Sequence, residues 1–251
     1  MNHLKTIYVL WLRQIKRYYR SRARIIGSLG QPILFLVALG YGMGHIFSQA
    51  GQGNYIQFLT PGVIGMSIIF TAMFSGAEII WDRQFGFLKE TLVAPVSRVA
   101  IMLGRTLGGA TVAVGQGLIV FLLATLFGFR PVDIIGIIPA FFFMSLIAIL
   151  FTALSTAMAS RLEDMQGFQL IMNFVVMPIF FLSGAIFPLN NLPPALSVIT
   201  KANPLSYGID AIRLYFSGTG QFSPLLDVSV LLAATAFFVG LGAWLFNGIE
   251  V

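Results

Sequence analysis

The sequence predicts an all-α, polytopic membrane protein built as one domain. Of its 251 residues, 57% are hydrophobic and 10% are charged, whereas soluble domains have roughly 45–50% apolar and about 25% charged residues. The mean hydropathy is +0.89. Six apolar stretches alternate with polar segments, and none of these segments is long enough for an independent soluble domain. We therefore expect a single transmembrane domain over residues 1–251.

Residues 1–24 are expected to form an amphipathic helix that lies in the headgroup plane. Its apolar side chains share one helical face, and its basic side chains lie mostly off that face, where they can extend to the headgroups. The apolar face holds Leu4, Ile7, Trp11, Ile15 and Tyr18, and the basic residues include Arg13, Lys16, Arg17 and Arg20. A basic tail that binds RNA is the weaker alternative, because its apolar face would then meet water.

Six stretches are long enough to cross a hydrocarbon core of roughly 30 Å at about 1.5 Å per residue. They cover residues 25–47, 59–80, 106–129, 134–160, 168–187 and 225–247. Pro32 predicts a kink early in the first span. The third span is rich in glycine, which predicts close packing against other helices through Gly108, Gly109, Gly115 and Gly117.

A charged segment, residues 81–105, separates the second and third spans. Phe85, Leu88 and Leu92 recur as one apolar stripe of a short helix. Pro95 is expected to end this helix, and Ser97 is placed to cap the next one. The residues alone leave open whether the short helix is an ordinary loop that rests on lipid headgroups.

Residues 188–224, between the fifth and sixth spans, are too many for a turn and too polar for another span. Asn203 followed by Pro204 predicts an N-cap and the first residue of a helix. Two short helices are expected, over residues 195–201 and 205–215. Their mixed composition fits helices that dip into the outer leaflet.

Lys and Arg residues predict the orientation of the spans. Twelve of the fifteen lie in the segments that would share one side of the membrane and three lie in the others. Because cytoplasmic segments carry the excess, we expect both termini and residues 81–105 in the cytoplasm. The net charge of +6 is therefore attributed to the membrane surface and not to nucleic acid. The location expected is the plasma (inner) membrane of a prokaryote.

Two segments resemble the ABC-2 type permeases, the membrane subunits of ATP-driven exporters. The first is WDRQFGFLKE with Leu92 and Pro95, and the second is Asn203-Pro204-Leu205-Ser206-Tyr207 with Asp210 and Arg213. The resemblance implies a coupling helix that sits in a groove of an ATPase, with the residues Asp82, Arg83, Phe85, Gly86, Phe87, Leu88, Lys89, Glu90, Leu92 and Pro95. It also implies a re-entrant region with Pro188, Pro193, Asn203, Pro204, Tyr207, Asp210 and Arg213.

One position departs from the family pattern. Many relatives carry an acid three residues after the loop glycine, where this chain has Lys89 followed by Glu90.

The same resemblance implies the partners. Two copies of a separate ATPase would hold ATP and Mg, and this chain would pair with itself or with a similar permease. The chain contains no GxxxxGK[ST] sequence, so no ATP site or other cofactor is expected on it. The loop is closer to the drug and lipo-oligosaccharide exporters, which implies an amphipathic drug, a glycolipid or a lipid-linked glycan as cargo.

Two other function classes, a secondary transporter and a membrane-embedded enzyme, fit the sequence less well than an exporter. An ion-coupled secondary transporter normally has an acid near the membrane midplane, but Glu78 and Asp227 are expected near span ends, in contact with headgroups. A membrane-embedded enzyme would need paired catalytic groups. The sequence has no cysteine, and its two histidines, His3 and His45, are far apart. No catalytic or metal-ligating residue is therefore predicted.

Overall fold

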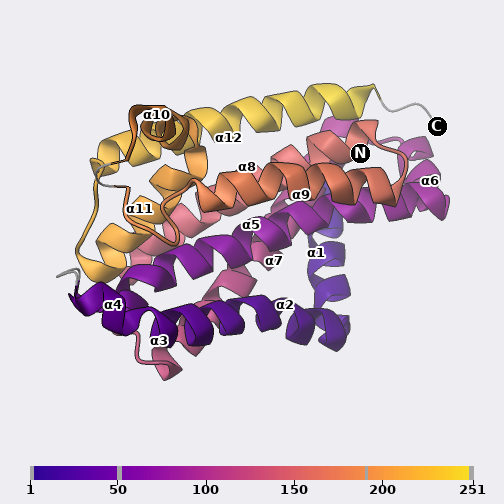
Figure 1. Ribbon diagram of the computed structural model, residues 1–251. Helices are drawn as coiled ribbons and strands as arrows, with labels where there is room; N and C mark the ends of the chain where they lie inside the picture. The colour runs from indigo at the N-terminus through magenta and orange to yellow at the C-terminus, as the bar shows by residue number, and fades with distance from the viewer. Residues whose placement is uncertain (1–2, 50–52, 190–191, 249–251) are drawn as a thin grey trace.

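The computed structural model describes residues 3–49, 53–189 and 192–248. Every regular element in these ranges is helical (Figure 1), which confirms the predicted all-α class. In chain order the elements are α1 (His3–Arg20), α2 (Arg22–Leu34), the π-helix η1 (Phe35–Leu39), α3 (Gly40–Gly42), α4 (Gly44–Gln49), α5 (Tyr55–Gln84), α6 (Phe87–Val93), α7 (Arg98–Leu126), α8 (Ile137–Arg161), α9 (Met165–Phe181), α10 (Pro194–Ala202), α11 (Pro204–Ser217) and α12 (Pro224–Asn247).

Five helical segments are long and apolar enough to cross a membrane. They are Arg22–Gly42, Tyr55–Gln84, Arg98–Leu126, Ile137–Arg161 and Pro224–Asn247. These segments correspond to the first four and the last of the predicted spans. Two of them, α5 and α7, continue further toward the charged loop than predicted, because ion pairs inside the bundle neutralise Asp82 and Arg105.

The predicted fifth span, residues 168–187, is helical only as far as Phe181. Its helix, α9, has 17 residues and reaches about 25 Å, less than the roughly 30 Å of a hydrocarbon core. Beyond it the chain turns at Gly184, which has a φ of 74°. The Tyr55 hydroxyl donates a hydrogen bond to the Ile186 carbonyl at 2.9 Å and holds this turn against α5.

The first span contains the irregular turn that its proline predicts. Pro32 lies inside α2, and the Phe35 N–H donates to the carbonyls of Gln31 and Pro32. The helix then widens into the π-helix η1 over Phe35–Leu39. A proline cannot make the usual bond to the residue four before it, and the π-helix follows directly after this missing bond.

α5 forms the centre of the bundle and packs against α2, α7, α8, α9 and α11. Glycines allow two of these approaches. The Gly76 N–H donates to the Ser155 hydroxyl at 3.0 Å, and a Cβ on Gly109 would lie 2.7 Å from the Ser75 hydroxyl. Of the four glycines predicted to pack closely in the third span, only Gly115 has open space in place of a neighbour.

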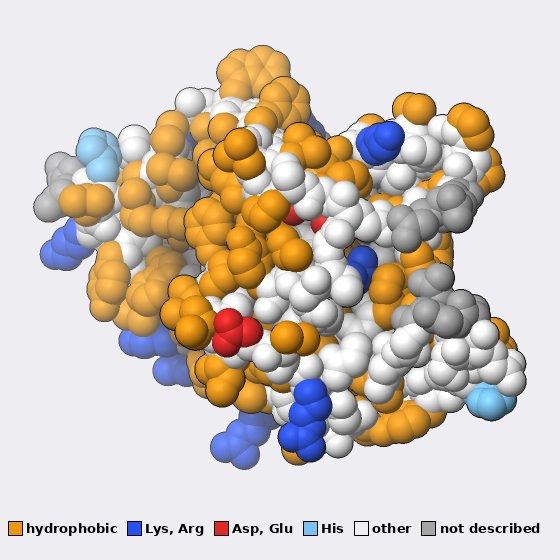
Figure 2. All heavy atoms as spheres, turned by 90° about the vertical axis from the view of Figure 1, so that its left-hand side faces the viewer, with side chains coloured by type: hydrophobic (Ala, Val, Ile, Leu, Met, Phe, Trp, Pro, Cys, Tyr) orange, Lys and Arg blue, Asp and Glu red, His pale blue; other side chains and the backbone are white. Residues whose placement is uncertain are grey.

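The two ends of the bundle differ. α1 lies across the bundle axis at the end that also carries α6 and the last turn of α12, whereas α4, α10 and α11 lie at the other end (Figure 1). The surface at that other end is mainly hydrophobic or uncharged, with scattered charged side chains (Figure 2). α1 is amphipathic as predicted, and it packs on α7 where Gly104 and Gly108 admit its backbone and side chains. We call the end with α1 and α6 the inner end and the opposite one the outer end.

Candidate functional site

The loop at the inner end begins inside α5. Asp82 and Arg83 occupy the last turn of α5, and Phe85 is its C-cap residue. Gly86 has a left-handed φ of 76°, a conformation that glycine enters without the steric cost of a Cβ. This turn starts α6 at Phe87. The chain therefore reverses sharply at a residue whose conformation favours glycine.

The predicted stripe of Phe85, Leu88 and Leu92 does not form one face, and this expectation was wrong. Leu88 is 2% exposed and belongs to the bundle core, and Leu92 packs against the same core. These two residues are four apart and face the bundle together. Phe85 precedes α6 and is 84% exposed, and Val93 is 82% exposed. The surface open to a partner includes Phe85, Lys89, Glu90 and Val93.

The end of α6 agrees with the sequence. Ala94 is extended before Pro95, with a ψ of 143°, as expected of a residue that precedes proline. The Ser97 hydroxyl accepts a hydrogen bond from the Ala100 N–H at 3.2 Å, so Ser97 caps α7 as predicted. α6 is therefore a short helix with a defined start and a defined end.

A cluster of ion pairs, which we call the inner-end network, fastens this loop to the bundle. Asp82 accepts from Arg105 at 2.7 Å, from Arg13 at 3.2 Å and from Arg17 at 3.4 Å. Glu78 accepts from Arg24 at 2.6 Å. Arginines of α1, α2 and α7 thus share the two carboxylates of α5. The expectation that Glu78 contacts headgroups was wrong, because its side chain is 6% exposed and is paired inside the protein.

Arg105 is the deepest member of this network. Its side chain is 3% exposed, and its Nε and Nη1 atoms have no hydrogen-bond partner among the described residues. Asp82 is the acid that compensates this buried charge. A buried cation that loses its partner is strongly destabilising, so the position of α7 depends on the carboxylate at the end of α5.

α1 contacts α6 directly through this network. The Arg13 guanidinium lies 4.0 Å from the centroid of the Phe87 ring while it also pairs with Asp82. On the other side of α5, Arg83 donates to the carbonyls of Leu162 and Ser160 at 3.0 and 3.2 Å. The α5–α6 junction is therefore held by α1 and by the segment that links α8 to α9.

Sequence reasoning missed the inner-end network, although a signal for it exists. Glu78 and Asp82 are four apart, and so are Arg13 and Arg17. Residues at this spacing lie on one face of a helix, so two acids of α5 could face two cations of α1. The amphipathic pattern of α1 taken alone predicts only headgroup contacts for these cations.

The residues predicted for the outer segment mostly fasten α11 to its neighbours. Asn203 caps α11 by accepting from the Leu205 N–H at 3.0 Å, and its side-chain amide donates to the Ile179 carbonyl at 2.6 Å. Pro204 is at the first helical position as predicted, and the Tyr207 hydroxyl donates to the Lys201 carbonyl at 2.7 Å. Pro193 precedes α10 as its N-cap residue.

Asp210 and Arg213, although predicted as a motif, bind different partners. Arg213 donates to the Gly184 carbonyl at 2.8 Å, and its guanidinium lies 4.1 Å from the centroid of the Phe58 ring. The Asp210 carboxylate accepts from the backbone N–H groups of Gln221 and Phe222 at 2.9 Å. Burial raises the pKa of Asp210, and these N–H donors partly offset the rise. Pro188 and Arg213 line a hollow at the outer end.

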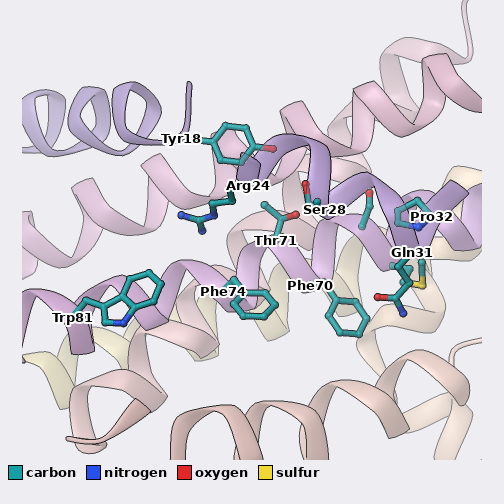
Figure 3. Close-up of a pocket in the computed structure, with 12 residues that line it drawn as sticks. Tyr18, Arg24, Ser28, Gln31, Pro32, Phe70, Thr71, Phe74 and Trp81 are labelled. Atoms are coloured by element: carbon teal, nitrogen blue, oxygen red, sulfur yellow. The ribbon is translucent and has the colours of Figure 1, made fainter. Parts of the chain in front are cut away.

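A cavity of about 450 Å³, which we call the α2–α5 pocket, lies between the first two spans. Two rows of side chains face each other across it (Figure 3). α5 contributes Phe70, Phe74 and Trp81, and α2 contributes Arg24, Ser28, Gln31 and Pro32. The α2 residues recur at helical spacing around Pro32, so one face of each span forms each wall.

The chemistry of this pocket is amphipathic. Four aromatic rings, those of Tyr18, Phe70, Phe74 and Trp81, supply apolar contact area, while Ser28, Gln31 and Thr71 supply uncharged polar groups. Arg24, which is part of the inner-end network, lines the pocket toward the inner end (Figure 3). A cavity of this size and composition is typical of sites that hold small or partly apolar ligands.

Asp227 departs from its expected contact with headgroups. It lies in the first turn of α12 and is 0% exposed. Neither of its carboxylate oxygens has a hydrogen-bond partner among the described residues. Asp227 does lie near a span end as expected, but the expected contact with headgroups was wrong, because its side chain is covered by protein in a helix that packs against α8 and α11.

Comparisons with known proteins agree with this architecture. Residues 5–216 match a family model described as ABC-2 type transporter. The ycf38 protein of Cyanophora paradoxa, whose name describes a transport permease, is 28% identical over 246 residues, which are 95% of this chain and 82% of that protein. Nodulation protein J of Rhizobium meliloti (strain 1021) is 28% identical over 232 residues, which are 89% of this chain and 86% of that protein.

Proposed function

Because the chain belongs to the ABC-2 type transporter family, we propose that it is the permease subunit of an ATP-driven exporter. Permeases of this family are membrane-embedded, lack an ATP site of their own and normally work with an ABC ATPase subunit. In this proposal two copies of a separate ATPase bind ATP and Mg. The permease provides the route across the membrane, and both of its termini are on the ATPase side of a prokaryotic plasma membrane.

The exposed surface of α6 supports the contact with the ATPase. Phe85 and Val93 place large apolar side chains outside the bundle, beside the charged side chains of Lys89 and Glu90. A rigid loop with exposed apolar residues fits a groove of a partner protein. Movement of α6 would reach the spans through Arg13 and Asp82, since these residues join α1 and α5 at the start of α6.

The α2–α5 pocket is the observation that supports the proposed class of cargo. Its aromatic wall suits an acyl, polyprenyl or ring system, and its polar wall suits the adjoining head of an amphiphile. We propose that it receives the lipid-proximal part of a lipid-linked glycan, a glycolipid or an amphipathic drug. A volume of about 450 Å³ is too small for a whole glycan, which would extend beyond the pocket.

The remaining parts of the proposal concern the layout in the membrane. In it α9 is a sixth crossing segment, completed by the turn at Gly184, and α10 and α11 dip into the outer leaflet. The exposed apolar side chains of α9, among them Leu170 and Phe174, support burial in lipid or against a second permease. Two permease chains, identical or similar, would enclose the path.

Transport into sealed inside-out vesicles that contain the permease and its ATPase tests this function. ATP should drive accumulation of a fluorescent amphiphile that the parent protein transports. Phe70→Ala with Phe74→Ala should reduce this accumulation without changing ATPase retention, because both rings line the pocket. Leu122→Ala with Leu126→Ala is a matched control, since these exposed side chains lie on α7, away from the pocket. Equal transport by both pairs would contradict the pocket assignment.

One observation favours a second candidate, ion-coupled secondary transport. The Asp227 carboxyl is fully covered and unpaired among the described residues, as a proton-carrying acid in a transporter can be. Asp227→Asn distinguishes the two functions. An ATP-driven exporter should keep most of its transport in this variant and should be insensitive to a protonophore. Loss of transport in the variant, together with a proton flux in the parent that depends on cargo, would favour the second candidate.

A further inference from the structure

A second cavity, of about 630 Å³, lies between α1 and the junction of α5 with α6. We call it the basic groove. Its cationic wall consists of Arg13, Lys16, Arg17 and Arg20, which all come from α1, and its apolar lining includes Val9 and Phe85. Each of the four cations lies three or four residues from two of the others along α1, so they project from one side of the helix. The basic groove shares no lining residue with the α2–α5 pocket.

Positive charge in the basic groove exceeds what the protein neutralises. Arg13 and Arg17 share the Asp82 carboxylate with Arg105. Arg17 also lies 3.8 Å from Glu78, which pairs more closely with Arg24. Lys16 and Arg20 are exposed and form no ion pair with any described residue. Six cations thus face two carboxylates, which leaves an excess of four positive charges.

The groove combines this charge with exposed apolar side chains. Val9 is 53% exposed, Phe85 is 84% exposed and Phe87 is 43% exposed. α1 lies across the bundle axis (Figure 1), the orientation of a helix that rests on a membrane surface. A ligand that fits must therefore present an anion to α1 and an apolar portion to the aromatic side chains.

We propose that the basic groove binds the phosphate-bearing headgroup of an acidic phospholipid. Lys16 and Arg20 contact the phosphate, and Phe87 and Val9 contact the glycerol and the upper acyl chains. Among the described residues, Asp82 is the one acid that lines this groove, so a phosphodiester supplies negative charge that offsets the excess of cations, and basic side chains beside a membrane are suited to such headgroups. The bound lipid would lie next to Phe85 and Phe87, at the start of α6, and would stabilise the loop in one position.

Lipid retention by the purified protein tests this proposal. The full chain, with its co-purifying partners, is extracted in a neutral detergent and incubated with equal amounts of phosphatidylglycerol and phosphatidylcholine that carry the same acyl chains. Bound lipids are then measured by mass spectrometry. The parent should retain phosphatidylglycerol preferentially. Lys16→Gln with Arg20→Gln should lower this preference by roughly fivefold for each cation removed.

A matched pair controls for general surface charge. Lys5→Gln with Arg22→Gln removes two exposed cations from α1 and from the start of α2, and neither residue lines the basic groove. This pair should retain phosphatidylglycerol like the parent. Glycerol 3-phosphate should compete only weakly, because it lacks the acyl chains. If glycerol 3-phosphate displaced phosphatidylglycerol completely, the site would be reassigned to a soluble phosphate ester.

Three further outcomes would overturn the proposal. Equal loss of phosphatidylglycerol from both pairs would mean diffuse attraction without a site. No loss from the Lys16 and Arg20 pair would mean that the lipid binds elsewhere. Loss of the ATPase from this pair, with unchanged lipid retention, would mean that the groove receives an acidic surface of the partner protein.

Discussion

Asp82 joins α1, α5 and α7 through one carboxylate. It is the acid that compensates Arg105, whose side chain is 3% exposed, and it also holds Arg13 beside Phe87. Such a residue stabilises the fold mainly by preventing an unpaired charge in the interior. It also links the start of α6 to α1, because Arg13 contacts both Asp82 and Phe87, the first residue of α6.

Asp82→Asn should therefore destabilise the protein strongly. The change leaves Arg105 buried without its charge partner, which costs about 3–5 kcal/mol. Glu163→Gln is the control, because Glu163 is exposed and its side chain forms no ion pair with a described residue. The unfolding temperature of both variants is measured in detergent, with size-exclusion chromatography used to monitor the loss of folded protein. An unfolding temperature for Asp82→Asn equal to that of Glu163→Gln would contradict the role of the inner-end network.

Gly86 gives a second test at the scale of single residues. Its φ of 76° is unfavourable for alanine by roughly 1–2 kcal/mol, whereas asparagine tolerates this region better. A Cβ would meet no atom within 4 Å, so any effect comes from the backbone. Gly86→Ala should lower ATPase retention and Gly86→Asn should restore part of it, measured by co-purification. Equal retention by Gly86→Ala and the parent would show that the loop tolerates another turn.

α6 is the element on which the proposed coupling depends. Its Leu88 lies in the core, while its Val93 and the preceding residue Phe85 are exposed. Phe85→Ala with Val93→Ala should weaken ATPase retention, because each large side chain buried in a partner contributes about 1.5–3 kcal/mol. The unfolding temperature of the permease should not change. ATPase co-purification and thermal unfolding are measured on the same samples.

Leu88→Ala is the counterpart on the inner face of α6. It should lower the unfolding temperature, because a truncated core leucine costs about 2–5 kcal/mol. If Phe85→Ala with Val93→Ala leaves ATPase retention intact while reducing insertion into the membrane, α6 is a lipid anchor and not a coupling helix.

The existence of α6 was predictable from the sequence, but its exposed face was not. Pro95 and Ser97 are local signals, and both act as predicted. The face depends on where the helix starts, and that is determined by the left-handed turn at Gly86, which shifts Phe85 out of the helix. Asn203 and Pro204 likewise predicted α11, whereas the contact of Asn203 with Ile179 joins segments that no local pattern relates.

At the scale of the whole molecule, composition predicted the helical membrane class and most of the spans. It could not predict that α5 and α7 carry charged residues into the bundle, because Asp82 and Arg105 are paired there only after the helices pack. Composition likewise could not predict that Asp227, in the last predicted span, is fully buried. The end of α9 could not be predicted from composition, because the apolar run continues past Phe181, where the chain already turns toward Gly184.

The predicted orientation can be tested by cysteine labelling, since the sequence contains no cysteine. Single cysteines at Ser48 and Asp133 should react with an impermeant reagent in intact cells. Cysteines at Lys89 and Glu163 should react only after the membrane is opened. All four positions are exposed. Labelling of Lys89→Cys in intact cells as readily as Asp133→Cys would mean that the orientation is reversed.

The central claim is that this chain is a permease driven by a separate ATPase. Native mass spectrometry of the complex isolated from its own membranes in mild detergent tests this claim most directly. We predict a mass equal to two permease chains, one of them this 27.4 kDa chain, together with two copies of a P-loop ATPase. A permease that is recovered intact without any ATPase, under conditions that preserve its pairing, would contradict the account.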